Sequence, residues 1–231
     1  MEGRYPAGVY IVLSDCKEPS REGEWNRWYD KAFVPGLESL GFVSHSRRYE
    51  NVFASEGTFR GRPKYLSVHE VAHADLPAAL KAIHKRESEL IAKGGGAAQA
   101  QLTKVNTLYG RAGPEFRSGK TDPIQIIYCG LVGMLDRSRT AEFDKWYNDR
   151  HSPDALNAGL FDVGYRYDVV DLHDPLPHLS SPCLSLYESS VPLPELQKKL
   201  ESFRKAMIEV DPLWVDLLGI WYSGLFRPMK K

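Results

Sequence analysis

The sequence predicts an α+β protein built from two similar units, each with the element order strand, helix, strand, strand, helix, strand. One observation is an internal repeat, because residue types match at a constant offset of 118 residues, as at Tyr10 and Tyr128. The other is that strand and helix periods follow one another in the same order in both halves. A constant offset indicates a duplicated structural unit. Further matches are Glu24 with Glu142, Trp28-Tyr29 with Trp146-Tyr147, Pro35 with Pro153, Arg48 with Arg166, and Glu70 with Glu188.

The elements expected in the two units correspond one to one. They are strands at residues 9–13 and 126–132, helices at 23–33 and 140–151, strands at 45–50 and 163–170, strands at 65–71 and 183–189, long helices from 76 and 193, and strands at 104–109 and 219–223. Pro35 and Pro153 are expected to end the first helices, because proline disfavours helical geometry in the residue before it. Pro77 and Pro194 suit the first turn of the long helices, where a missing N–H costs little.

The same pattern predicts the domain organisation and the faces of the sheets. Residues 1–112 are expected to form the first repeat, 113–122 a linker and 123–231 the second repeat. In the first strand Val9 and Ile11 alternate with Tyr10, so one face is more apolar than the other. We expect the apolar set to meet the helices, and tyrosines, serines and His69 to lie on the bare face, which the other repeat would cover.

Composition limits the class of protein. The chain has 231 residues, 42% of them hydrophobic, with 30 basic and 30 acidic residues and no stripe of basic ones. A nucleic-acid binder is therefore not expected. No segment approaches the roughly 20 apolar residues needed to cross a membrane, and three widely spaced cysteines suit a reducing compartment. These features predict a soluble, cytoplasmic protein that binds neither nucleic acid nor membranes.

Residues 142–153, with the sequence EFDKWYNDRHSP, and the matching Trp28-Tyr29 with Pro35, resemble the EthD-like branch of the dimeric α+β barrel superfamily. Arg47-Arg48-Tyr49 and Tyr165-Arg166-Tyr167 extend the resemblance into the following strand. It implies two ferredoxin-like βαββαβ repeats that form a single-chain pseudo-dimeric α+β barrel, and hence a monomer, with a homodimer as the alternative. Relatives include cofactor-free monooxygenases, isomerases, cyclases, decarboxylases and haem-binding peroxidases, so the fold does not select the reaction.

His151 is the first candidate for chemistry, because the matching position in the first repeat is Phe33. An imidazole suits general acid–base catalysis, although a histidine at a helix end can also interact with the last carbonyls. Tyr147 lies one helical turn earlier and would be its hydrogen-bond partner or a packing residue. Arg166 would hold a substrate oxyanion, or else form a cross-strand ion pair with Glu188, as Arg48 would with Glu70.

Further side chains of the second repeat are expected to bind substrate or to serve where two sheets meet. These candidates are Tyr128, Trp146, Tyr167, Tyr187 and Glu188. His69 matches Tyr187 and is expected at an interface. His173 and His178 are expected in a solvated, proline-rich loop, for which a lid or a weak metal site is the alternative.

The predicted function is that of a cofactor-independent enzyme acting on a small aromatic or polyketide-like molecule by proton-transfer lyase, isomerase or cyclase chemistry. Cofactor-free monooxygenation is a variant of this hypothesis. The alternative is a non-catalytic small-molecule-binding or structural barrel protein. The sequence contains no phosphate-binding glycine loop and no HExxH zinc motif, so neither an organic cofactor nor a metal is expected. Haem, with His151 or His69 as ligand, is the less favoured possibility.

Overall fold

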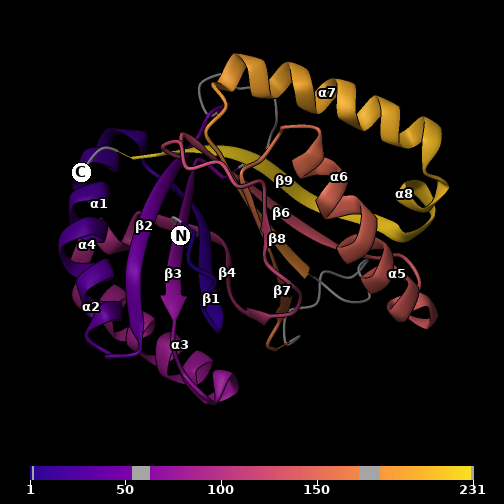
Figure 1. Cartoon of the computed structure of the whole chain (residues 1–231). Coiled ribbons are helices and arrows are strands. Elements are labelled where there is room, and N and C mark those ends of the chain that lie inside the picture. Colours follow the sequence, from indigo (N-terminus) through magenta and orange to yellow (C-terminus); the bar gives the residue numbers. More distant parts are fainter. Residues whose placement is uncertain (2, 54–62, 172–182, 230–231) are drawn as a thin grey trace. The chain divides into compact units, whose positions relative to one another are not determined.

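The computed structural model describes residues 1, 3–53, 63–171 and 183–229, which form two compact units (Figure 1). Unit 1 comprises Pro6–Gly110 with Met1 and Met229, and unit 2 comprises Arg111–Pro228 with residues 3–5. The first residues of the chain therefore belong with its second half. Both units combine helices with antiparallel strands, which gives the mixed α+β class expected from the sequence. Among the described residues, no helix is both long and apolar enough to cross a membrane.

Unit 1 has a four-stranded antiparallel sheet in the order β4-β1-β3-β2. Its strands are β1 (Gly8–Cys16), β2 (Val43–Asn51), β3 (Tyr65–Val71) and β4 (Gln101–Arg111), and its helices are α1 (Glu22–Trp28), α2 (Val34–Glu38), α3 (Leu76–Lys93) and α4 (Gly95–Gln99), with short turns η1 (Pro19–Arg21) and η2 (Tyr29–Phe33). The element order of the main strands and helices follows the prediction.

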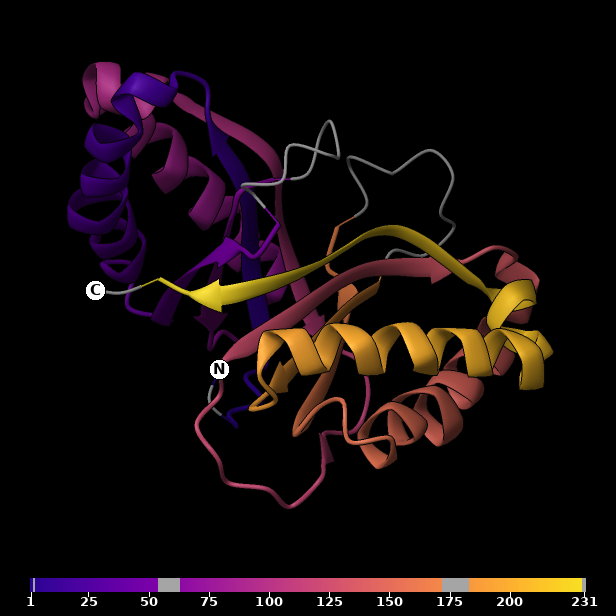
Figure 2. The same ribbon diagram turned by 90° about the horizontal axis from the view of Figure 1, so that it is seen from above.

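Unit 2 repeats this order, with strands β9-β6-β8-β7-β5. Its strands are β5 (Phe116–Arg117), β6 (Ile126–Met134), β7 (Val163–Val169), β8 (Cys183–Ser189) and β9 (Leu218–Pro228), and its helices are α5 (Thr140–Trp146), α6 (Ser152–Asn157), α7 (Leu193–Val210) and α8 (Pro212–Leu217), with turns η3 (Arg137–Arg139) and η4 (Tyr147–His151). The short β5 pairs with β7 and lies within the segment expected to be a linker. Figure 2 shows α7 on the same side of this sheet as α5 and α6.

The first helix of each unit continues past its proline, contrary to the sequence prediction. The turns η2 and η4 are π-helical, and in η4 the Ser152 N–H donates to the Tyr147 carbonyl five residues earlier. Pro153 then occupies the first turn of α6, where its missing N–H is not needed. The wider π turn therefore allows a new helical segment to begin around the proline. Such π turns are frequent at functional sites.

The predicted assignment of sheet faces is wrong. Tyr10 and His69, register partners on β1 and β3, lie on the helix side, where the Tyr10 hydroxyl donates to Glu87 of α3. In unit 2, Tyr147 of η4 contacts Ser185 of β8 in the same way. Residues 8–14 of β1 are all buried, so both faces of the strand are covered. The polarity of the side chains therefore does not show which face of the sheet the helices cover. The covered face carries hydroxyl groups that form hydrogen bonds with residues of the helices.

Candidate functional site

His151 ends the π turn η4 and lies among aromatic side chains. Its ring centroid is 4.9 Å from that of Trp146, 4.5 Å from Tyr147 and 4.7 Å from Trp214. The Nδ1 atom is buried and has no hydrogen-bond partner. Burial lowers the pKa of His151 to about 3, and the nearby Asp211 carboxylate opposes this shift only in part. The imidazole is therefore neutral at physiological pH.

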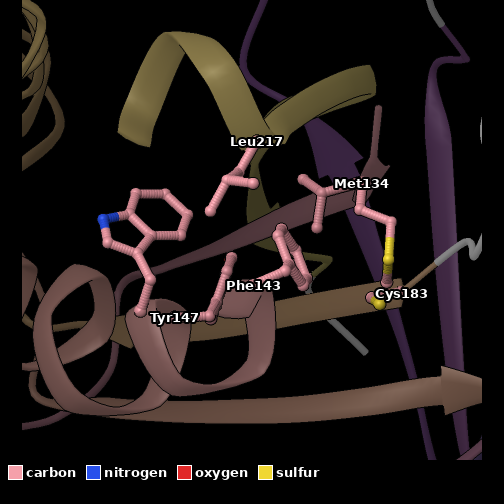
Figure 3. Close-up of a cluster of buried hydrophobic side chains, with 7 residues drawn as sticks. Met134, Phe143, Tyr147, Cys183 and Leu217 are labelled. Carbon is pink, nitrogen blue, oxygen red and sulfur yellow. The ribbon is translucent and has the colours of Figure 1, made fainter. Parts of the chain in front are cut away.

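Asp211 holds Trp146, one of the aromatic side chains beside His151, in place. It receives a 2.6 Å hydrogen bond from Trp146 Nε1 and a 3.1 Å bond from the Leu213 N–H, which caps α8. Trp146 also belongs to a buried cluster between α5, the sheet and α8. Figure 3 shows this cluster, in which Met134, Phe143, Cys183 and Leu217 gather between α5 and α8.

A chain of hydroxyl groups connects η4 and α6 to the sheet. Tyr147 Oη lies 2.5 Å from Ser185 Oγ, and Ser152 Oγ lies 2.8 Å from Tyr187 Oη. Tyr128 packs 6.0 Å from Tyr187, measured between ring centroids. Burial, and next to it the neighbouring Tyr187, raise the pKa of Tyr147 well above its usual value. These phenols are therefore protonated and act as hydrogen-bonding groups.

Arg166 lies beneath η4, and its predicted pairing with Glu188 is wrong. Its guanidinium donates to Asp144, and at 3.2 Å to Asn148, and lies 5.3 Å from the centre of the Tyr147 ring. Glu188 instead accepts a 3.0 Å hydrogen bond from Tyr165. Arginine and glutamate occupy opposite faces of the sheet, because their positions on adjacent strands differ in parity.

The arginine of unit 1 repeats this arrangement. Arg48 donates to Asp30 at 2.9 Å and to Asn26 at 2.7 Å, both on the helical segment above it. Its register partner on β3 is Ser67, whereas Glu70 lies next to His45. The predicted Arg48–Glu70 ion pair is therefore also wrong.

The structure separates the predicted site residues into two sets. His151, Tyr147, Trp146, Arg166, Tyr128 and Tyr187 lie on the helix side of the sheet in unit 2. Tyr167 and Glu188 lie on the other face, where Tyr5 packs 5.2 Å from Tyr167, centroid to centroid. The first set forms one continuous group around His151. Its catalytic and substrate-binding roles stay predictions.

Sequence reasoning missed a groove beside this group. The groove has a volume of about 550 Å³ and is lined by Ala158, Glu195, Lys198, Lys199, Ser202, Phe203 and Ala206. Phe203 lies 6.0 Å from Trp214, which in turn contacts His151. The signal in the sequence is the spacing of Leu196, Leu200 and Phe203 along α7, an apolar stripe of which only Leu196 is fully buried.

His69, expected at an interface, is instead buried under the helices of unit 1. Its ring lies 6.0 Å from that of Tyr10. Burial and the nearby Arg48 guanidinium lower the pKa of His69 to about 3. His173 and His178 lie outside the described residues. Within the described part of the chain, no three histidine, cysteine or acidic side chains are grouped as metal ligands would be.

Comparison with known proteins identifies the fold. No family model and no curated protein sequence matches this chain. A DypB variant from Rhodococcus jostii RHA1, solved in complex with haem, is 10% identical with a TM-score of 0.58, covering 98% of this chain and 94% of that one. A dye-decolorizing peroxidase from Bacteroides thetaiotaomicron VPI-5482 is 9% identical with a TM-score of 0.59 and the same coverage. The fold of this chain is similar to theirs.

A further structure, which its name places with the chlorite dismutases, is 10% identical with a TM-score of 0.55, covering 96% of this chain and 94% of that one. These structures share the α+β barrel fold expected from the sequence, but they do not support the predicted EthD-like branch. They also correct the predicted function. The neighbours with this fold are dye-decolorizing peroxidases, one of them solved in complex with haem, and none of those named above is a lyase or isomerase. The prediction of cofactor-free lyase, isomerase, cyclase or monooxygenase chemistry is therefore wrong.

Proposed function

We propose that this protein is a haem-dependent redox enzyme, built from two repeats of one ferredoxin-like module, in which unit 2 holds the haem. The observation that carries the proposal is His151, a neutral imidazole between aromatic rings and close to an open groove. The similarity of the fold to haem-bound structures supports it. Haem would supply one-electron redox chemistry that no side chain provides.

The His151 imidazole is chemically suited to bind a haem iron. Imidazole binds metals in its neutral form, and burial keeps His151 neutral far below physiological pH. Iron-binding histidines usually donate their second ring N–H to a carboxylate or carbonyl. Asp211 is the carboxylate that acts on this ring, although it now accepts from Trp146. Asp211 would thus orient both the Trp146 ring and the His151 ring.

The groove fits the remainder of such a ligand. Ala158, Phe203 and Ala206 provide apolar lining, and Lys198 provides a cation that would pair with one carboxylate of haem, whereas Lys199 is already paired with Glu195. Trp214 contacts both Phe203 and His151 and therefore separates the groove from the imidazole. The indole would have to turn aside before a ligand in the groove reaches His151.

The test is titration of the purified protein with haemin, followed by the Soret band. His151→Phe, which introduces the residue of unit 1, is expected to weaken binding at least about tenfold and to remove the spectrum of a histidine-ligated iron. His84→Phe, at an exposed histidine of unit 1, is the matched control and should bind as the wild type does. Equal binding by wild type and His151→Phe, or no saturable binding by the wild type, would refute the proposal.

A further inference from the structure

Among the described residues, the large apolar side chains that remain exposed all lie in unit 2. Each is 40–64% exposed, and five of the six belong to one continuous stretch of chain that runs from the end of α7 through α8 into β9. They are Leu135, Ile208, Val210, Val215, Ile220 and Trp221. Single exposed apolar residues are ordinary, but a group of large ones in one place indicates an interaction surface.

These six residues lie at one end of unit 2 and are called the end patch below. The N–H of Leu135, which follows β6, donates to the carbonyl of Leu217 at the end of α8 at 3.1 Å. Ile220 of β9 is the register partner of Val132 on β6, so β9 begins beside the same end of β6. Figures 1 and 2 both show the end of α7, α8 and the start of β9 together at this end.

Unit 1 shows that the fold does not require apolar residues at these positions. β4 and β9 each contain a β-bulge at the corresponding place, and α3 and α7 are equally long, so residues of the two units can be matched. Unit 1 exposes a lysine at three positions where unit 2 exposes an apolar side chain. The pairs, unit 1 first, are Lys104 with Trp221 in the bulge, Lys93 with Val210 at the helix end, and Lys17 with Leu135. The apolar end patch therefore requires an explanation other than the fold.

The size and support of the end patch fit a protein interface. A stable interface covers roughly 800 Å² on each partner and has an apolar centre with a polar rim. Six large side chains, each about half exposed, provide such a centre. Tryptophan is among the residue types that contribute most to binding energy, which singles out Trp221. Leu217 of α8 is fully buried in the cluster shown in Figure 3, so the end patch adjoins a packed core.

The charges around the end patch restrict what covers it. Acidic residues directly follow three of its residues in the sequence, and two basic residues lie on the last two turns of α7. These exposed charged residues are Asp136, Glu209, Asp216, Arg204 and Lys205. The acidic groups disfavour an anionic lipid surface. A rim with charges of both signs is able to complement itself, because a two-fold axis brings the same surface of a second copy against it.

We propose that this protein forms a two-fold homodimer through the end patch, with Trp221 as the main anchor. The occupant of the end patch is thus a second copy of this chain. The proposal uses neither the groove nor the chemistry of His151, so it does not depend on the haem proposal.

The test is sedimentation equilibrium of the full-length, haem-free protein over a wide range of micromolar concentrations. A reversible dimer is expected, with a dissociation constant at least about thirtyfold higher in Trp221→Lys, because the anchor is lost from both copies. Val210→Lys should also weaken the dimer. Both variants introduce the lysine that unit 1 has at the matching position. Lys104→Ser, in the matching bulge of unit 1, is the control and should leave the dissociation constant unchanged.

Three results would overturn the proposal. One is a wild type that stays monomeric, in which case flotation with neutral phosphatidylcholine vesicles would separate a lipid surface from a different protein as the occupant. Another is a dimer that Trp221→Lys and Val210→Lys leave intact, which would place the interface elsewhere. The third is equal weakening by Trp221→Lys and Lys104→Ser. Circular dichroism of each variant confirms folding, and if Trp221→Lys does not fold, Val210→Lys decides alone.

Discussion

The hydroxyl of Tyr147 lies 2.5 Å from that of Ser185 in a buried hydrogen bond, whereas the matching hydroxyls of Tyr29 and Ser67 form no bond of regular length, although Ser67 still lowers the pKa of Tyr29 against the larger effect of burial. The same pair of residue types is thus more tightly hydrogen-bonded in unit 2 than in unit 1. The surroundings of the two pairs also differ, since Tyr187 of unit 2 is replaced by His69 in unit 1. The same serine-to-alanine substitution can therefore be compared between the two units.

Ser185→Ala is expected to lower the free energy of unfolding by about 1–2 kcal/mol, because it leaves the Tyr147 hydroxyl buried without a partner. Ser67→Ala is expected to change the free energy of unfolding by less than about 0.5 kcal/mol, because Ser67 Oγ makes no hydrogen bond of regular length that would be lost. Urea denaturation of the two variants measures the difference. Equal losses would indicate that both hydroxyls are equally bonded in solution.

Asp144→Ala is expected to destabilise the protein by about 2–3 kcal/mol, because it removes the carboxylate that pairs with a buried guanidinium. The side chain of Arg166 is 2% exposed and that of Asp144 is 44% exposed. If the ion pair is broken, water can therefore solvate the carboxylate more easily than the guanidinium. Asp149→Ala is the control, since Asp149 pairs with Lys145 at the surface and should cost no more than about 0.5 kcal/mol. Thermal unfolding of both variants at low and high salt provides the comparison, and similar losses would contradict the burial of Arg166.

Acid should destabilise the protein through His69, which is fully buried, and through His151, which is partly buried. Burial lowers the pKa of both His151 and His69 to about 3 from the ordinary value of 6.5. Between these pH values the unfolded chain binds protons that the folded chain does not, so stability is present above pH 6.5 and is lost as the pH falls. Each histidine contributes a slope approaching 1.4 kcal/mol per pH unit, as an order of magnitude.

His151→Phe should therefore remove about half of this additional slope while leaving the contribution of His69. Urea denaturation at several pH values between 4 and 7, a range chosen to lie within the window of the two histidines, measures the slopes. His84→Phe, at an exposed position, should leave the pH dependence as it is in the wild type. An unchanged slope in His151→Phe would show that the His151 ring is charged, and hence solvated, in the folded protein.

Local patterns in the sequence located the strands well. β3 and β8 have the bounds that their alternation predicts, Tyr65–Val71 and Cys183–Ser189, because each is an uninterrupted run bordered by loop residues. The helix ends were not predictable, since the π turn before Pro153 involves a hydrogen-bond pattern that no residue type signals. The prediction of the sheet faces failed because both faces of the strand are buried, which removes the contrast between polar and apolar positions.

The candidate site was predicted in part, for a related reason. Trp146, Tyr147 and His151 lie within two turns of one helical segment, and their proximity follows from helical spacing alone. Trp214 and Asp211 complete the surroundings of His151 from a segment about 60 residues later in the sequence. Contacts between residues so far apart in the sequence depend on how α8 packs against α5. The periodicity within a single helix carries no information about such packing.

Tyr5 offers a test of how the start of the chain stabilises unit 2. Its hydroxyl is 2.9 Å from the Gly113 carbonyl and 2.5 Å from that of Arg166, and its ring packs on Tyr165 and Tyr167. Tyr5→Phe should cost about 0.5–1.5 kcal/mol by removing the donor. Tyr5→Ala should cost about 2 kcal/mol more, because the ring contacts are lost as well.

Hydrogen exchange distinguishes a local effect of these two variants from a global one. Amide protection along β7, Val163–Val169, should fall in Tyr5→Ala before protection in unit 1 does, because Tyr5 contacts unit 2. Tyr49→Phe, at a buried tyrosine on β2 of unit 1, is a control that should leave β7 protected. If Tyr5→Ala and Tyr5→Phe were equally stable, the ring would contribute nothing. The first residues would then be held only through the hydroxyl, and β7 would lose the same amount of protection in both variants.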